Sequence, residues 1–181
     1  MSSSEKKGKV KIFRFDPASG QKERYDTFED IPYEGLTVLN VLNFIYRERD
    51  TSLAIRDSLC TQGFCGGCAV MVNGKITMAC HTLATEEMTI EPHPGFKIIK
   101  DLVCDWNIEE ESPRPVKSRV EITIDKNECI ECLDCVKMCT MKVFKVVNKR
   151  IIPSNPKRCM GLSCRICMDT CWRRAININE M

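Results

Sequence analysis

The sequence of 181 residues has no long hydrophobic run and no excess of charge of either sign. Its longest mostly apolar stretch, Val38 to Tyr46, is interrupted by Asn40 and Asn43, whereas a membrane-spanning helix needs roughly 20 apolar residues. Lys and Arg number 27 and Asp and Glu 25, and nucleic-acid-binding proteins are usually far more basic. The composition therefore argues against a membrane-spanning protein and against a nucleic-acid-binding protein.

Catalytic motifs are missing as well. No nucleophile is paired with a base, and Gly63, Gly66 and Gly67 do not satisfy the dinucleotide-binding fingerprint. The carboxylates of Asp125 and Glu128 are expected at the surface. The sequence therefore assigns no catalytic residue and predicts no substrate site of the chain's own.

Cysteine, by contrast, is abundant, with 13 residues. The first ten residues are polar and lysine-rich, unlike a secretory signal peptide. The odd number of cysteines also fits a disulfide framework poorly. Intracellular metal ligands are the better interpretation, and we expect a cytoplasmic protein that meets a membrane only through partners.

Twelve of the cysteines form three groups of four along the chain. The groups are Cys60, Cys65, Cys68 and Cys80; Cys129, Cys132, Cys135 and Cys139; and Cys159, Cys164, Cys167 and Cys171. Four thiolates at such spacings are what an iron–sulfur cluster needs. Only Cys104 is left over, and we expect it to be a buried, inert thiol.

The first group has the spacing C-x4-C-x2-C-x11-C. Its first three positions match the plant-type ferredoxin spacing for a [2Fe–2S] cluster. Asn73-Gly74 is a strong signal for a two-residue hairpin, which would bring Cys80 beside Cys65 and Cys68. We call these four cysteines the first set; tetrahedral zinc is the alternative for them.

Here the sequence resembles the iron–sulfur subunit of the succinate dehydrogenase and fumarate reductase family. The matching segments are Cys60-Thr-Gln-Gly-Phe-Cys65-Gly-Gly-Cys68, Val72-Asn-Gly74, Met78-Ala-Cys80 and Ile99-Lys-Asp-Leu-Val103. The resemblance covers residues 10–107 and implies a β-grasp domain with one [2Fe–2S] cluster.

The second group is the C-x2-C-x2-C-x3-C run of bacterial ferredoxins, in which the fourth cysteine binds the other cluster. This crossing predicts two further ligand sets. The second set is Cys129, Cys132, Cys135 and Cys171, and the third set is Cys139, Cys159, Cys164 and Cys167. Residues 120–179 resemble dicluster ferredoxins, which implies two [4Fe–4S] clusters in a pseudo-twofold (βαβ-like) arrangement.

The chain departs from the dicluster pattern in two ways. The spacing from Cys159 to Cys164 is x4 instead of x2, and Thr140 and Trp172 stand where proline usually follows the fourth cysteine. The longer spacing leaves the cluster of the third set open between [4Fe–4S] and [3Fe–4S]. Because only 19 residues separate Cys139 from Cys159, a helical domain with a quinone pocket has little room. We therefore favour a compact module and a [4Fe–4S] cluster.

The hydrophobic patterns predict an α+β protein of two domains. Residues 1–9 form a polar tail, 10–107 the [2Fe–2S] domain, 108–119 a Pro-containing linker and 120–181 the dicluster domain. A helix follows the N-cap residue Thr37. The expected strands are residues 10–15, 22–31, 69–72, 75–79, 88–91, 120–124, 143–147, 151–152 and 175–178.

Four other side chains lie close to the ligands in sequence. His81 is expected at the surface, where it would only secondarily tune a cluster. Arg173 and Arg174 are expected at a solvated end. Trp172 would either shield a cluster or lie at an interface, and the sequence favours neither.

The pattern as a whole predicts an electron-transfer subunit of a hetero-oligomeric oxidoreductase, of the kind used in anaerobic metabolism. One [2Fe–2S] and two [4Fe–4S] clusters would relay single electrons between a flavin-containing catalytic subunit and a second redox protein. A freely diffusing ferredoxin-type carrier is the main alternative, and a redox-sensing or structural metal protein is a third.

Overall fold

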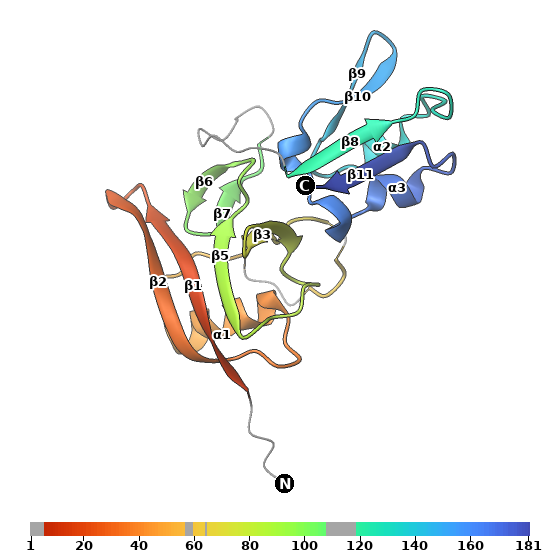
Figure 1. Ribbon diagram of the computed structural model, residues 1–181. Helices are drawn as coiled ribbons and strands as arrows, with labels where there is room; N and C mark the ends of the chain where they lie inside the picture. Colours follow the sequence, from red (N-terminus) through yellow and green to blue (C-terminus); the bar gives the residue numbers. More distant parts are fainter. Residues whose placement is uncertain (1–5, 57–59, 64, 108–118) are drawn as a thin grey trace.

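The computed structural model describes residues 6–56, 60–63, 65–107 and 119–181. Figure 1 shows two bodies side by side, which we call the N-terminal region (residues 6–107) and the C-terminal region (residues 119–181). The predicted linker lies outside the described residues except for its last residue, Arg119.

The N-terminal region is built on a mixed five-stranded sheet with the order β2-β1-β5-β3-β4. The strands are β1 (Lys7–Asp16), β2 (Gln21–Pro32), β3 (Ala69–Val72), β4 (Lys75–Met78) and β5 (Glu87–Pro92). β1 and β5 run parallel, and the other neighbours are antiparallel. All five strands were predicted, although β1 begins at Lys7, three residues before the expected start.

Helix α1 (Val38–Glu48) packs its apolar face against this sheet. The Thr37 hydroxyl accepts a hydrogen bond from the Asn40 amide at 3.2 Å, which confirms the predicted N-cap. Val38, Val41 and Ile45 recur at helical spacing and are fully buried. One helix held against a mixed sheet is the arrangement expected of a β-grasp domain.

A short hairpin of β6 (Lys97–Lys100) and β7 (Val103–Asp105) follows the sheet and was not predicted. Its turn is fixed by the buried carboxylate of Asp101, which accepts hydrogen bonds from the amides of Phe15 and Ala54 at 2.9 and 2.8 Å. Arg14 Nε lies 3.2 Å from the same carboxylate. Because the two opposite charges are buried together, their pairing ties the hairpin to β1.

The C-terminal region consists of two strand pairs and two short helices. β8 (Val120–Ile124) pairs antiparallel with β11 (Ile176–Glu180), and β9 (Phe144–Val147) with β10 (Arg150–Pro153). The α-helices are α2 (Asp134–Met138) and α3 (Ile166–Thr170), and two 3-10 turns are η1 (Pro156–Arg158) and η2 (Gly161–Ser163). The strands were predicted, β8 with the expected bounds and the others shifted by one or two residues, whereas the helices were not.

The two halves of this region repeat one another. Leu133 and Arg165, the residues just before α2 and α3, both have left-handed backbone conformations, with φ of 71° and 55°. Lys142 and Arg174 correspond in the same way, with φ of 51° and 53°. The pseudo-twofold arrangement that the resemblance implies is therefore accompanied by equivalent backbone conformations in the two halves.

Candidate iron–sulfur centres

The first set lies on the loop before β3 and at the end of β4. The β3–β4 hairpin, which turns at Asn73-Gly74 with positive φ at both residues, brings Cys80 against Cys68. The Cys80 amide donates to Cys68 Sγ at 3.4 Å. Burial, followed by a hydrogen bond with Cys68 and by the charges of Cys68 and Cys60, raises the pKa of the Cys80 thiol to about 11. The structure therefore joins Cys60, Cys68 and Cys80.

Backbone amides of the same loop point at the sulfurs. The amide of Gln62 donates to Cys60 Sγ and that of Gly67 to Cys65 Sγ, both at 3.4 Å. Cys65 is exposed. Hydrogen bonds of this kind stabilise the negative charge on cluster thiolates and help to set the reduction potential. The loop thus has the donors that a thiolate-bound cluster requires.

The second set surrounds one cavity of the C-terminal region. Cys129, Cys132, Cys135 and Cys171 all line it. Burial, followed by the charges of the other three cysteines, raises the pKa of Cys135 to about 11. Cys171 thus lies around the same cavity as three cysteines that precede it by more than thirty residues.

The third set surrounds a separate cavity. Cys139, Cys159, Cys164 and Cys167 line it together. The pKa of Cys167 is raised to about 12 by burial and then by Cys159, Cys139 and Cys164, and the pKa of Cys159 is raised to about 11, again mainly by burial. Each of these two cavities has about 380 Å³ of empty space, open solvent at the mouth included.

The chemistry of these donors suits a cationic metal cluster. Closely placed thiols do not all ionise on their own, because each thiolate disfavours the next. Bound iron removes that penalty and deprotonates the thiols. In the described ranges no group of three or more His, Cys, Asp and Glu side chains is placed so that it could hold a metal ion. The four cysteines of the second set and the four of the third set each line one cavity, which leaves space between the sulfurs for a cluster.

The second and third sets each contain a cysteine that accepts the same kind of backbone hydrogen bond. The amide of Val143 donates to Cys139 Sγ and that of Ala175 to Cys171 Sγ, in both cases at 3.4 Å and four residues along the chain. Val143 and Ala175 are both buried. Cys139 and Cys171, the last cysteine of each group, therefore accept equivalent hydrogen bonds from a buried residue of the following segment.

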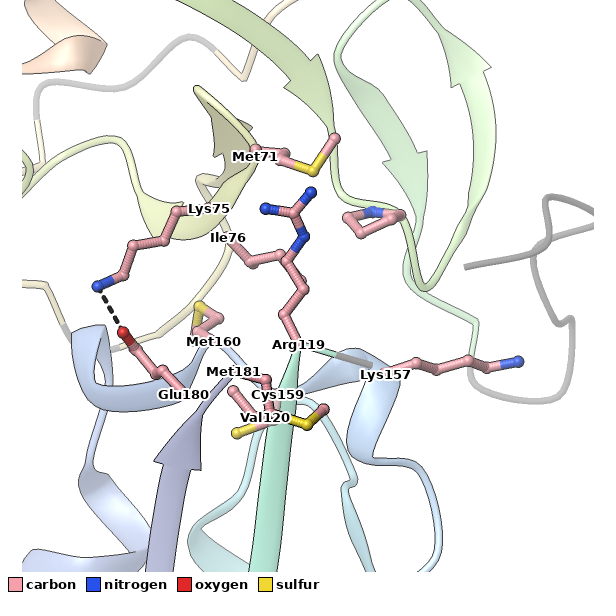
Figure 2. Close-up of a pocket in the computed structure, with 12 residues that line it drawn as sticks. Met71, Lys75, Ile76, Arg119, Val120, Lys157, Cys159, Met160, Glu180 and Met181 are labelled. Carbon is pink, nitrogen blue, oxygen red and sulfur yellow. Dashed lines mark hydrogen bonds and ion pairs between the residues drawn. The ribbon is translucent and has the colours of Figure 1, made fainter. Parts of the chain in front are cut away.

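The long spacing between Cys159 and Cys164 forms the 3-10 turn η2. The Gly161 amide donates to Cys159 Sγ at 3.3 Å. Glu180 accepts from the Leu162 amide at 2.9 Å and forms an ion pair with Lys75 of β4 at 2.9 Å. Figure 2 shows Lys75 and Glu180 reaching toward each other beside Met160. The extra residues thus lie between the two regions, which the sequence did not reveal.

The remaining sequence candidates are placed as follows. Cys104 is 3% exposed, and its thiol lies 3.8 Å from the His93 carbonyl oxygen, as expected of a structural cysteine. His81 is exposed, as predicted. Arg173 donates to Glu128 at 2.7 Å, and its guanidinium lies 5.4 Å from the Trp172 ring centroid.

Arg158 is a site residue that the sequence analysis missed. It directly precedes Cys159, is 1% exposed, and its guanidinium lies 4.7 Å from the Phe96 ring centroid in the N-terminal region. Its Nε donates to the Gly95 carbonyl oxygen at 3.4 Å. Only the three-dimensional contact identifies it, because an arginine beside a ligand cysteine has no pattern of its own.

The geometry describes an iron–sulfur protein, and comparison with known proteins gives its family. A family described as "2Fe-2S iron-sulfur cluster binding domain" matches residues 9–112. The match covers more than half of the chain, and the chain therefore belongs to this family, whose members bind a [2Fe–2S] cluster.

Curated relatives give a more particular similarity. The fumarate reductase iron–sulfur subunit of Wolinella succinogenes is 29% identical over 162 residues, which cover 75% of this chain and 67% of the relative. The succinate dehydrogenase iron–sulfur subunit of Paracoccus denitrificans is 32% identical, with 71% and 58% covered. The predicted resemblance to these subunits is confirmed.

Other relatives are much longer than the matched part. A fumarate reductase (CoM/CoB) polypeptide of Methanothermobacter marburgensis is 30% identical over 72% of this chain, and the match spans 29% of that protein. A chain in a solved structure, "Mycobacterium smegmatis Sdh1 complex in the apo form", is 22% identical, with 76% of this chain and 65% of that chain covered and a TM-score of 0.49.

Among the described residues, no helix is both long enough and apolar enough to cross a membrane.

Proposed function

We propose that the protein is the electron-transfer subunit of a multi-subunit oxidoreductase and carries one [2Fe–2S] and two [4Fe–4S] clusters. The observation that carries the proposal is the separation of twelve cysteines into three sets, two of which surround cavities of their own. Clusters bound by thiolates accept and donate single electrons. The chain's own residues supply the ligands, the amide donors and the burial that set the potentials.

The ligand assignment follows the three sets. Cys60, Cys65, Cys68 and Cys80 would hold the [2Fe–2S] cluster in a domain of residues 10–107. The second and third sets would hold the two [4Fe–4S] clusters in a domain of residues 120–181, joined to the first by the linker at 108–119. All four cysteines of the third set line its cavity, which supports [4Fe–4S] over [3Fe–4S].

The partners are proposed from the relatives. Subunits of fumarate reductase and succinate dehydrogenase are similar to this chain over most of its length, and we infer a flavin-containing catalytic partner and a second redox protein. The complex would be cytoplasmic, with membrane contact through partners only. The reaction of the complex follows from the catalytic partner and not from this chain.

Metal analysis of the anaerobically purified protein tests the proposal. We expect about ten iron atoms and a matching amount of acid-labile sulfide per chain, the sum for one [2Fe–2S] and two [4Fe–4S] clusters. Zinc in place of iron, or about four iron atoms, contradicts the three-cluster assignment. Co-purification with a flavoprotein supports a fixed subunit, whereas a lone 20.7 kDa species supports the freely diffusing carrier.

A further inference from the structure

Arg56 lies against the loop that carries the first set. It precedes Cys60 by four residues, and its Nη1 donates to the Gly67 carbonyl oxygen at 3.1 Å. The Gly67 amide in turn donates to Cys65 Sγ at 3.4 Å, and Cys68 directly follows Gly67 in the chain. The guanidinium group is therefore placed on the backbone between two cysteines of the first set.

Gly67 leaves the space that this guanidinium group needs. A Cβ atom at Gly67 would lie 3.0 Å from Arg56 Nη1, 3.3 Å from Cζ and 3.5 Å from Nε. Gly63 and Gly66 of the same loop have left-handed backbone conformations, with φ of +62° and +69°, whereas Gly67 does not. The backbone at Gly67 therefore does not require glycine, and the missing side chain serves the contact with Arg56.

The segment that carries Arg56 is anchored independently of this contact. The Ala54 amide donates to the buried carboxylate of Asp101 at 2.8 Å, and the Leu102 amide donates to the Ala54 carbonyl oxygen at 3.3 Å. Leu53, one residue earlier, is also buried. Because the backbone is held two residues before Arg56, the side chain reaches the loop from a fixed position.

The positive charge of Arg56 has no carboxylate partner among the described residues. Within these residues its guanidinium group forms no ion pair, and the Gly67 carbonyl oxygen accepts its hydrogen bond. Arginine does not lose its proton in proteins. The amides of Gln62 and Gly67 also favour negative charge on the sulfurs of this loop. A full positive charge thus lies beside the thiolates that these amides serve.

We propose that Arg56 is a tuning residue, one that sets the reduction potential of the [2Fe–2S] centre without binding it, and that its charge raises this potential. The inference rests on the proposed function, because it concerns the cluster that the first set would hold. On reduction by a redox partner the centre gains one electron and one negative charge, with no bond made or broken. A nearby cation therefore stabilises the reduced form more than the oxidised form.

Redox titration of the anaerobically purified protein, followed by the electron paramagnetic resonance signal of the reduced [2Fe–2S] centre, tests this role. Arg56→Gln removes the charge and keeps a hydrogen-bond donor. We expect the equilibrium constant for reduction to fall about tenfold, which is about 59 mV for one electron. Arg56→Lys keeps the charge and should retain most of the wild-type potential. Arg47→Gln, at an exposed arginine in the last turn of α1, is the control and should leave the potential unchanged.

A variant at Gly67 moves the guanidinium group without changing its charge or a ligand. The methyl group of Gly67→Ala displaces the flexible end of Arg56, and we expect a smaller fall in potential than in Arg56→Gln. Combining the two changes should add nothing to the effect of Arg56→Gln alone, because both act through one contact. Since Arg56 is exposed, the fall in Arg56→Gln should also shrink as salt screens the charge.

Two results overturn the role of Arg56. One is a wild-type potential in both Arg56→Gln and Gly67→Ala, and Gly67→Ala decides alone where Arg56→Gln loses its cluster. The other is an equal fall in Arg56→Gln and Arg56→Lys that salt does not reduce, which indicates that the side chain only shapes the loop. A wild-type protein without a [2Fe–2S] signal contradicts the proposed function itself, whereas a normal signal with unshifted variants rejects only the role of Arg56.

Discussion

The two regions reach a folded state by different means. The N-terminal region has a continuous apolar core between one helix and a five-stranded sheet, with Ile12, Val41 and Ile90 fully buried. The C-terminal region has two-stranded pairs and helices of five residues, and buried cysteines such as Cys135 and Cys167 form part of its core. The comparison indicates that packing stabilises the first region, whereas on the proposed assignment the second depends on its metal centres.

Removing iron is expected to give the largest effect. Chelation after reduction should unfold the C-terminal region, because the four cysteines around each cavity then have no metal to hold them together. Hydrogen exchange measured by mass spectrometry should show lost protection in β8 and β11 and retained protection in β1 and β2. A mock-treated sample is the control, and continued protection of β8 and β11 contradicts the comparison.

A core truncation should destabilise the N-terminal region. Ile45→Ala removes a fully buried side chain of α1, and we expect the free energy of unfolding to fall by about 2–5 kcal/mol. Urea denaturation followed by circular dichroism measures the change. Leu83→Ala, at a position 66% exposed, is the control and should change the free energy by less than about 0.5 kcal/mol. Equal losses of unfolding free energy in Ile45→Ala and Leu83→Ala would show that core packing is not what stabilises this region.

Loss of the buried cation between the regions should give a smaller change. Arg158→Met removes the contact with Phe96 and the hydrogen bond to Gly95, and we expect a loss of about 2 kcal/mol. Urea denaturation of the cluster-loaded protein, followed through Trp106 fluorescence in a Trp172→Phe background, measures it. Arg165→Met, at an exposed arginine paired with Asp169, is the control. An unchanged free energy of unfolding in Arg158→Met would show that the contacts of Arg158 with Phe96 and Gly95 do not stabilise the protein.

The ion pair between Lys75 and Glu180 should contribute least. Lys75 and the Leu162 amide hold the pKa of Glu180 below its usual 4.5. Because the folded pKa is the lower one, the stabilisation is present above about pH 4.5 and is lost as the pH falls through the lowered value. Glu180→Gln should cost about 0.2–1 kcal/mol at pH 7, and less at high salt.

The matched control for this ion pair lies within one region. Glu29→Gln breaks the exposed pair with Lys9, which joins β1 and β2. Urea denaturation at low and high salt measures both variants. A large loss in Glu180→Gln that salt does not reduce shows that the Leu162 hydrogen bond, and not the charge, fixes the η2 turn.

Local patterns in the sequence predicted most of the N-terminal region. The Asn73-Gly74 turn and the cap at Thr37 act between residues near one another in the chain, and both appear where expected. Helices α2 and α3 were missed because five residues show too little periodicity to be recognised. Their position follows instead from the cysteines that they carry.

Contacts between residues far apart in the chain could not be predicted from local patterns, except where cysteine spacing indicates them. The cysteines that the ferredoxin spacing assigns to one ligand set also line one cavity in the C-terminal region, and their role as cluster ligands stays a prediction. Arg158 and Glu180 were missed, since each acts on a residue of the other region, Phe96 and Lys75. Which set faces the N-terminal region depends on such contacts and has no local signal.

The crossing of Cys139 and Cys171 also bears on how the protein is made. The first set is complete once Cys80 has left the ribosome, so its cluster can be inserted early. The third set is not complete until Cys167, and the second not until Cys171. On the proposed assignment, the half of the C-terminal region that is synthesised first waits for the other half, and the two centres mature together, late in synthesis.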